Sequence, residues 1–153
     1  MKGIPYLFLG LLAAVLGTAQ PVHATLGESA DSVTKDREAL SAVQAATTTR
    51  NAYTVQEISS DSVAIREYIS PSGAVFGIAW NGLIHPDLTL LLGSYTGEYQ
   101  KSMRQTHRKP GSRFSQIKTD RIVVEKWGHM RNLRGRAYVP SLVPSGVTID
   151  EIK

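Results

Sequence analysis

The 153-residue sequence contains no cysteine. This absence excludes disulfides, thiol catalysis and metal sites built on cysteine ligands, so stability has to come from the packing of a core. Histidine is also scarce, and its four copies show neither a His-x-x-x-His nor a His-Glu-x-x-His spacing. No Gly-x-Ser-x-Gly turn marks a serine nucleophile. We therefore expect a protein without a metal or cofactor, and we favour a protein that is not an enzyme.

Long apolar runs are scarce too. One spans residues 4–17 behind the positive charge of Lys2, and it is shorter than the roughly 20 residues that cross a bilayer. Val22 and Ala24 place small residues at positions −3 and −1 of a cleavage site, which is typical of a secretory signal peptide cut between Ala24 and Thr25. Because no cysteine follows, a lipoprotein anchor is excluded. We expect residues 1–24 to be removed and residues 25–153 to form a single periplasmic or secreted domain without a membrane span.

Acidic residues are scarce in the C-terminal part of the chain. Residues 101–153 carry twelve basic and four acidic side chains, a net charge of +8, whereas residues 25–100 carry four basic and nine acidic ones, a net charge of −5. The two parts either neutralise each other in the fold or leave a basic surface that binds a polyanion. No nucleic-acid-binding motif is present. Because an exported protein does not meet the genome, we expect an anionic envelope polymer or another envelope protein as the partner, and no genomic nucleic acid.

The first structural element that the sequence predicts is a long helix over residues 25–49. Val33, Leu40 and Val43 form a thin apolar stripe at helical spacing. The β-branched residues Thr47 and Thr48 favour extended backbone, so they are expected to lie where this helix ends.

Strands are predicted over residues 53–59, 63–69 and 74–81. In the third of them large and small residues alternate, so the strand has a large face and a small face. The large face is Phe76, Ile78 and Trp80, and the small face is Val75, Gly77 and Ala79. A helix can approach small residues closely, so we expect the N-terminal helix to pack on the small face.

The C-terminal half of the chain predicts a helical insertion and further strands. Pro86 and Asp87 are typical of a helix start, and the spacing of Tyr95, Tyr99 and Met103 predicts a second short helix. Strands are expected over residues 114–118, 121–127 and 129–139. The prediction is an α+β fold: a long N-terminal helix packed on a curved antiparallel sheet of about five strands, with a short helical insertion at residues 86–103.

Two segments carry residues that could perform chemistry. In the first, His85 and Asp87 follow Trp80 closely. A carboxylate that orients a histidine can make the histidine a general base. Alternatively, both side chains cap the helix that begins at Pro86, because both can accept hydrogen bonds from its free amide groups.

The second segment is the arginine-rich strand expected over residues 129–139. Alternation places Asn132, Arg134, Arg136 and Tyr138 on one face and His129 with Arg131 on the other. Arginines in a row beside an aromatic ring suit planar anions such as phosphate, sulfate or carboxylate. Alternatively, the arginines pair with carboxylates across the sheet, for which the candidates are Glu57, Glu67 and Glu98.

Several blocks of the sequence resemble a known family. The blocks are TLG at residues 25–27, REY at residues 66–68, VFGIAWNG at residues 75–82, PDL and LLGSY within residues 86–95, and GHMR and GRAYVP within residues 128–140. They are similar to the exported bacterial family labelled domain of unknown function 2844, and the resemblance extends over nearly all of residues 25–153. It implies export and a single domain, and it implies no activity, ligand or catalytic residue.

These features predict a non-catalytic periplasmic or secreted binding module for an anionic envelope ligand. The candidate contact residues are Trp80, His85, Asp87, Tyr95, Tyr99, His129, Arg131, Arg134, Arg136 and Tyr138. Two alternatives stay open. One is a small envelope enzyme that uses His85 or His129 as an acid or base, and the other is a structural subunit of an envelope assembly.

Overall fold

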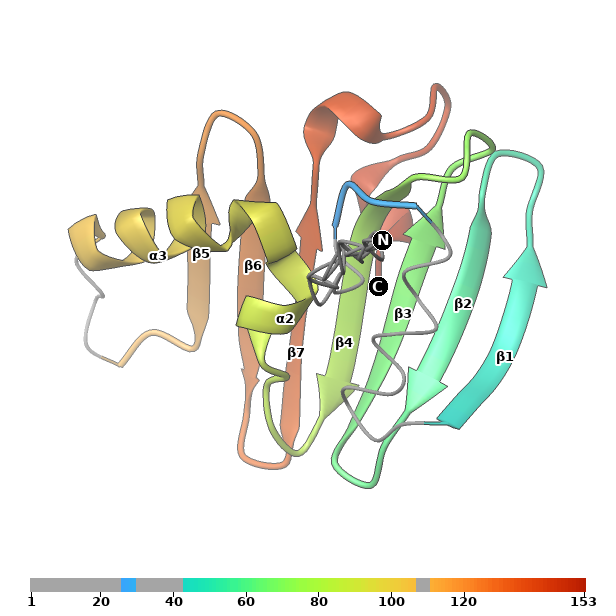
Figure 1. Ribbon diagram of the computed structural model, residues 1–153. Coiled ribbons are helices and arrows are strands. Elements are labelled where there is room, and N and C mark those ends of the chain that lie inside the picture. Colours follow the sequence, from blue (N-terminus) through green and yellow to red (C-terminus); the bar gives the residue numbers. More distant parts are fainter. Residues whose placement is uncertain (1–25, 30–42, 107–110) are drawn as a thin grey trace, which may run out of the picture.

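The computed structural model describes residues 26–29, 43–106 and 111–153, and its centre is a seven-stranded antiparallel sheet with the order β1-β2-β3-β4-β7-β6-β5 (Figure 1). The strands are β1 (Val43–Thr49), β2 (Thr54–Ser59), β3 (Val63–Ile69), β4 (Val75–Gly82), β5 (Phe114–Lys118), β6 (Val123–His129) and β7 (Asn132–Tyr138). The first four strands form a meander. The chain then crosses to the opposite edge, forms β5 and β6, and returns so that β7 pairs with β4.

A helical segment connects β4 to β5. It consists of α2 (Leu88–Leu92), the 3-10 turn η2 (Gly93–Tyr95) and α3 (Thr96–Gln105). The Asp87 carboxylate begins α2 by accepting a hydrogen bond of 2.8 Å from the Thr89 amide, and Gly93 ends it with a positive φ of 45°. The predicted helical insertion is therefore present. Within the described ranges, no helix is both long and apolar enough to cross a membrane.

The prediction for the N-terminal part of the fold is wrong. Residues 43–49, the last part of the expected helix, form strand β1 at the edge of the sheet, while residues 30–42 lie outside the described residues. The sheet has seven strands rather than about five, and most of the described fold is β. The reason lies in the β-branched residues Thr47 to Thr49: they favour extended backbone, and the edge of β2 gives that backbone a partner.

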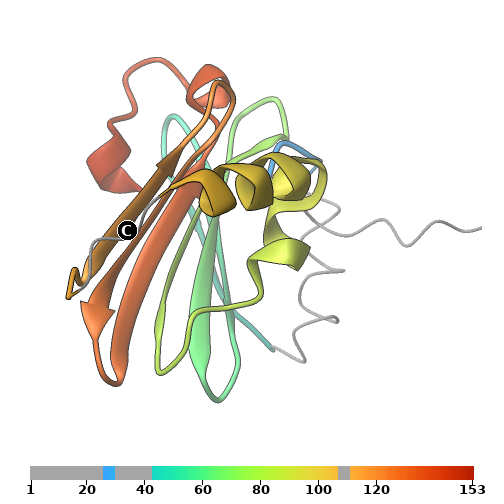
Figure 2. The same cartoon turned by 90° about the vertical axis from the view of Figure 1, so that its left-hand side faces the viewer.

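Other parts of the chain pack on both faces of the sheet, as Figure 2 shows from the side. The helices cover one face, where the core contains Ile58, Ile65, Ile78, Trp80, Val124 and Ala137 from the sheet and Leu88, Leu91, Leu92 and Tyr99 from the helical segment. The C-terminal tail, residues 139–153, packs on part of the other face. There the core contains Tyr53, Tyr68, Phe76, Ala79 and Ile152. We call these the helix face and the tail face.

A β-bulge overturns the predicted division of β4 into a large and a small face. Ile69 pairs with Val75 but Tyr68 pairs with Gly77, so Phe76 is the extra residue. Phe76 consequently lies on the tail face, where its ring centroid is 6.1 Å from that of Tyr68. A Cβ at Gly77 would lie only 2.9 Å from Ile152 Cδ1. The C-terminal tail, and not an N-terminal helix, therefore packs on the small residues of β4.

Polar contacts fasten the tail to the sheet. The Tyr53 hydroxyl donates to Glu151 Oε2 at 2.8 Å, and the Tyr68 hydroxyl donates to the main-chain oxygen of Lys153 at 2.9 Å. Arg66 Nη1 donates to the same oxygen at 3.1 Å. The amide of Thr148 and the Tyr53 hydroxyl lower the pKa of Glu151 by stabilising its charged form. Of the two turns of the tail, η3 (Pro140–Leu142) and η4 (Ile149–Glu151), these contacts hold η4 and the residues after it on the sheet.

Candidate functional site

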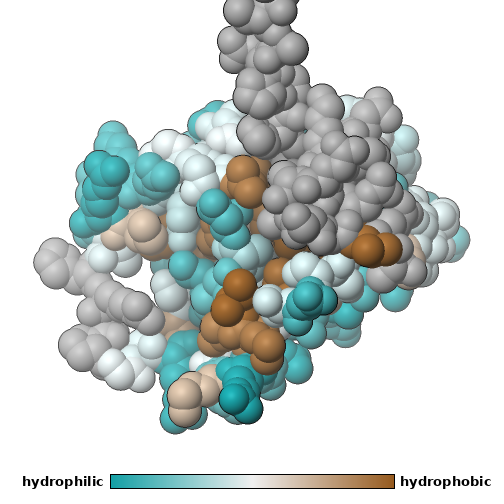
Figure 3. All heavy atoms as spheres, turned by 60° about the horizontal axis from the view of Figure 1, so that its bottom comes forward, coloured by the Kyte–Doolittle hydropathy of each residue, from teal (hydrophilic) through white to brown (hydrophobic). Residues whose placement is uncertain are grey.

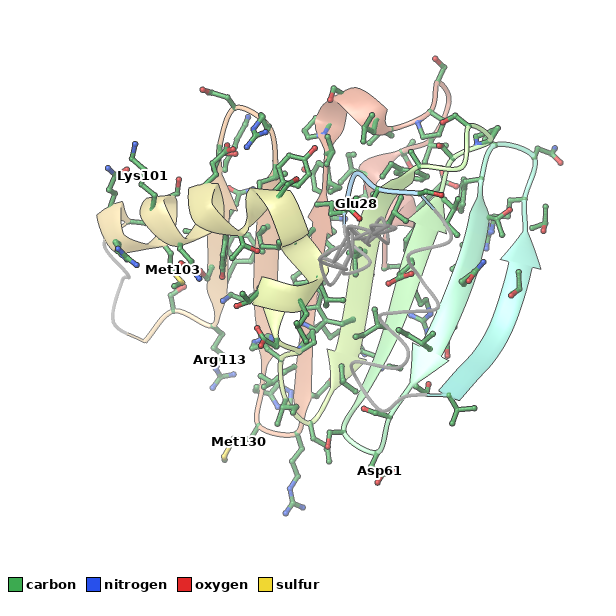
Figure 4. All side chains as sticks on the ribbon, in the orientation of Figure 1. Glu28, Asp61, Lys101, Met103, Arg113 and Met130 are labelled. Carbon is green, nitrogen blue, oxygen red and sulfur yellow. The ribbon has the colours of Figure 1, made fainter. Side chains whose placement is uncertain are left out.

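A groove of about 860 Å³ lies on the helix face, between α3 and the first residues of β5 with the last residues of β6. It is lined by His85, Met103, Thr106, Ser112, Arg113, Phe114, Ser115, Gln116, Ile117, Lys126, Trp127, Gly128 and Leu133. A smaller hollow of about 260 Å³ adjoins it over the start of α2 and shares His85, Met103 and Lys126 with it. In Figure 4 Met103 lies on the underside of α3 and Arg113 at the start of β5.

His85 is held in the groove by Trp80. The buried Trp80 indole donates a 2.9 Å hydrogen bond to His85 Nδ1, and the two rings are nearly perpendicular, at 86°. Because Nδ1 accepts this bond, a neutral His85 carries its proton on Nε2. Burial and then the positive charge of Lys126 lower the pKa of His85. At neutral pH the groove therefore presents a neutral imidazole as a hydrogen-bond donor.

Trp80 can lie in the core only because β7 has glycine beside it. Gly135 pairs with Trp80 across the β4–β7 ladder. A Cβ at Gly135 would overlap the Trp80 ring and would lie 2.6 Å from the main-chain oxygen of Glu125. The position of His85 thus depends on a close contact between two strands that are far apart in the sequence.

Lys126 and Arg113 give the groove its positive charge. Lys126 Nζ donates to the hydroxyl of the buried Tyr99 at 2.9 Å, which joins β6 to α3. Arg113 is exposed at the mouth of the groove. Among the described residues that line the larger groove none is a carboxylate. These two cations are not among the residues predicted from the sequence, although the dense basic stretch at residues 104–113 and the Lys126-Trp127 pair were available signals.

The structure does not pair His85 with Asp87. Asp87 Oδ1 caps α2, as the capping interpretation predicted, whereas His85 bonds to Trp80 instead of capping the helix. The general-base pair therefore has no geometric support. Within the described ranges no group of three His, Asp or Glu side chains is placed to hold a metal ion.

The arginine-rich segment is two strands joined by a turn. β6 ends at His129, and Met130 with Arg131 forms the turn before β7. Arg131 has a φ of 63°, which a non-glycine residue rarely adopts outside turns. His129 pairs with Asn132 and so lies on the same face as Asn132. The predicted placement of His129 on the opposite face is therefore wrong, because it assumed one continuous strand.

Asn132, Arg134, Arg136 and Tyr138 do share one face, and it is the tail face, opposite the groove. Arg136 is largely buried there and pairs with Glu125 at 2.5 Å, while its Nη1 donates to the main-chain oxygen of Ile149 at 2.8 Å. Burial and then the charge of Glu125 raise the pKa of Tyr138. Arg136 is therefore occupied in holding the tail, and the ten candidate residues do not form one surface.

Two of the three predicted partners of the arginine row pair elsewhere. Glu57 pairs with Arg66, and Glu98 pairs with Arg121, whose guanidinium also lies 4.9 Å from the centroid of the Tyr95 ring. Glu67 is buried on the helix face, across the sheet from Arg136. Of the four ion pairs between described residues, Arg121–Glu98 alone joins the acidic and the basic parts of the chain. The basic part therefore keeps most of its excess charge.

Lowering the pH is expected to destabilise the protein through His85. Its pKa is lowered in the fold, so the unfolded chain binds the proton first, and the free energy of unfolding falls as the pH drops below the unfolded-state pKa of about 6.5. Urea unfolding at about pH 7.5 and about pH 5.5 measures this change. His85→Gln keeps an acceptor for Trp80 and should reduce the pH dependence of the free energy of unfolding. An unchanged pH dependence in His85→Gln would contradict this assignment.

Comparison with known proteins places the chain in a family without assigning it an activity. The family model described as "Protein of unknown function (DUF2844)" matches residues 22–152. No curated protein and no solved structure matches the chain.

Proposed function

The chain belongs to the protein family of unknown function DUF2844, and we propose that it is a non-catalytic binding protein of the cell envelope whose groove binds an anionic ligand. The N-terminal layout of a signal peptide supports export, which would place the domain in the periplasm or outside the cell. The observation that carries the proposal is the groove itself: Lys126, Arg113 and His85, which offers its Nε2 donor, line the same concave site. No carboxylate is among the described residues that line this larger groove.

The rest of the lining supports a ligand that is not a bare ion. Met103, Ile117 and Leu133 contribute apolar area beside the cations, whereas the strand register places the side chains of Phe114 and Trp127 on the tail face. Binding sites commonly combine such apolar walls with a few well-placed polar groups. An anionic glycan has both properties, because the C–H face of a sugar ring can pack on apolar side chains while its acid groups meet the cations. We therefore take an anionic envelope polysaccharide as the ligand class.

The contacts of the histidines favour binding over catalysis. His85 Nδ1 accepts from the indole of Trp80, so no carboxylate orients this ring as a general base. Asp87 is committed to the start of α2. His129 lies exposed at the end of β6, outside the groove lining. A polar donor that is fixed by a buried indole suits recognition of an anion.

Titration calorimetry with dextran sulfate as the probe, and neutral dextran as its uncharged counterpart, tests the proposal. We expect binding of dextran sulfate alone, with an affinity that falls as salt is raised. Lys126→Gln keeps a donor for Tyr99 but removes the charge, and it should weaken binding about tenfold or more, as expected for a charge-assisted hydrogen bond.

The matched control is Lys118→Gln. Lys118 is an exposed lysine of β5 outside the groove lining, so this variant loses the same charge and should bind like the wild type. Equal losses in the two variants would show that binding follows net charge alone. That result would reject the groove as the site, and an affinity that does not change with salt would separately contradict an anionic ligand.

A further inference from the structure

The exposed apolar side chains of this protein gather at one end of the sheet. In the described part of the chain six large apolar side chains are exposed, and five of them lie at this end: Val43, Leu83, Ile84, Phe114 and Met130. The strand register places them there. Val43 at the start of β1 pairs with Ser59 at the end of β2, and Gly82, just before Leu83, pairs with Val63 of β3 and with Leu133 of β7. Leu133 also pairs with Gly128, just before the β6–β7 turn that holds Met130, and Phe114 at the start of β5 pairs with Trp127 near the end of β6. Figure 3 brings this end forward and shows apolar atoms near the middle of the view. We call it the apolar end.

The opposite end of the sheet has no such side chains among the described residues. Its turns expose polar groups and proline instead: Asn51, Pro71, Ser72, Asp120 and Arg121. Single exposed apolar residues are ordinary on protein surfaces, but a cluster of them commonly marks an interaction site. The difference between the two ends shows that the cluster is not a general property of the loops of this fold.

The loops of the apolar end have a well-held backbone. The Leu83 amide donates to the main-chain oxygen of Ser62 at 2.8 Å, so the connection after β4 is tied to the β2–β3 turn. Even so, Leu83 is 51% and Ile84 54% exposed, and Met130 is 90% exposed in the β6–β7 turn. Their side chains thus project outward from these turns instead of folding back onto the sheet.

Basic side chains surround these apolar tips. Arg113, Arg131 and Arg134 are exposed at this end, and none of the three pairs with a carboxylate of the described residues. The acidic side chains nearby are Asp61 in the β2–β3 turn and Asp87 at the start of α2. In Figure 4 Met130, Arg113 and Asp61 all lie toward the lower side of the molecule. Counted over the residues that the structure describes, the apolar end therefore carries a net positive charge.

We propose that the apolar end binds the surface of an anionic lipid membrane. Apolar side chains on the tips of separate loops, flanked by arginines, suit a fluid bilayer: each tip enters the interfacial region while the guanidinium groups meet lipid phosphates. A protein partner would instead need a surface shaped to fit several separate projections. The proposal does not depend on the proposed function, although the two surfaces adjoin at Phe114 and Arg113.

Sedimentation with vesicles tests the proposal. The probes are vesicles of phosphatidylcholine alone and vesicles that also contain phosphatidylglycerol. We expect the wild type to prefer the anionic vesicles. Leu83→Gln with Met130→Gln should reduce that binding at least about tenfold, from the lost apolar burial. Arg131→Gln with Arg134→Gln should reduce it about fivefold for each arginine. All variants carry the same N-terminal segment, so differences between them report on the apolar end.

The controls separate this surface from net charge and from the groove. Lys118→Gln removes a cation near the opposite end of the sheet, and Met103→Gln removes the sixth exposed apolar side chain, which lies on α3; both should bind vesicles like the wild type. The four positions substituted to test the apolar end, Leu83, Met130, Arg131 and Arg134, do not line the groove. Failure of vesicle binding and failure of dextran sulfate binding can therefore be told apart.

Three outcomes would overturn the proposal. The first is equal binding of both vesicle types, and the second is wild-type binding by the Leu83/Met130 variant. The third is a concentration-dependent dimer, seen by light scattering and lost in that variant, together with an absence of vesicle binding. This last outcome would assign the apolar end to a second copy of the chain.

Discussion

Gly135→Ala is expected to lower the free energy of unfolding by about 3 kcal/mol or more. The new Cβ would overlap the ring of Trp80 and press on the main-chain oxygen of Glu125. Neither neighbour can move freely, because Trp80 is 3% exposed in the core and Glu125 belongs to the β6–β7 ladder. Urea unfolding followed by tryptophan fluorescence measures the loss, and soluble yield gives a second measure if the variant folds poorly.

Gly97→Ala is the matched control for this prediction. Gly97 lies in α3, and a Cβ there would meet nothing within 4 Å. Alanine favours a helix more than glycine does, so this variant should gain about 0.5–1 kcal/mol. A Gly135→Ala protein as stable as the wild type would mean that Trp80 can leave its place. In that case the hydrogen bond that positions His85 is not fixed by the packing of β4 against β7.

Arg136→Met is expected to destabilise the protein by about 3–5 kcal/mol. The substitution leaves the Glu125 carboxylate nearly buried, with Gln116 as its remaining hydrogen-bond partner among the described residues. It also removes the donor to the main-chain oxygen of Ile149, which holds the tail on the sheet. Urea unfolding should show the loss. Amide hydrogen exchange should become faster than in the wild type, and this increase should be larger in residues 147–152 than in β3 and β4.

Two further variants show where this energy comes from. Arg134→Met removes an exposed arginine two residues earlier on the same face, and it should change stability by no more than about 0.5 kcal/mol. Replacing both members of the buried pair, with Arg136→Met and Glu125→Met, should cost less than Arg136→Met alone, because no unpaired charge remains. If Arg134→Met costs as much as Arg136→Met, Arg136 does not hold the tail.

The role of Arg136 shows how one row of residues is organised across the whole sheet. Ala46, Glu57, Arg66, Ala79, Arg136, Glu125 and Gln116 follow one another across the seven strands. Arg66 pairs with Glu57 and Arg136 with Glu125, on either side of Ala79. The small Ala79 side chain leaves room there for the tail. An arginine row that resembled an anion site in the sequence is, at Arg136, part of the packing of the fold.

Local sequence signals predicted much of the architecture. Alternating strands with polar turns predicted β2, β3 and β4, and similar signals predicted β5, β6 and β7. Asp87 as a cap and the spacing of Tyr99 and Met103 predicted the helical segment. These signals act over a few residues of chain, and the fold keeps them because the tertiary contacts agree with the local preferences.

The candidate site was predicted only in part. Trp80, His85, Asp87 and Tyr99 do lie around the groove and the hollow beside it. Lys126 and Arg113 were missed, because nothing in their immediate sequence shows that β6 and the start of β5 face His85. Tyr95 pairs with Arg121, and Arg136 and Tyr138 lie across the sheet. Which cation meets which ring depends on the register between strands, and register is a non-local property.

Residue identities and local patterns were enough to establish the cysteine-free chemistry, the charge difference between the two parts of the chain, the family and most of the strands and helices. The tertiary structure alone decided that residues 43–49 pair as an edge strand, that the bulge moves Phe76 to the tail face, and that His85 bonds to Trp80. It also decided that the exposed apolar residues meet at one end. The physical reason is the same in each case. Propensity and periodicity act along the chain, whereas strand pairing, bulges and burial depend on residues that only folding brings together.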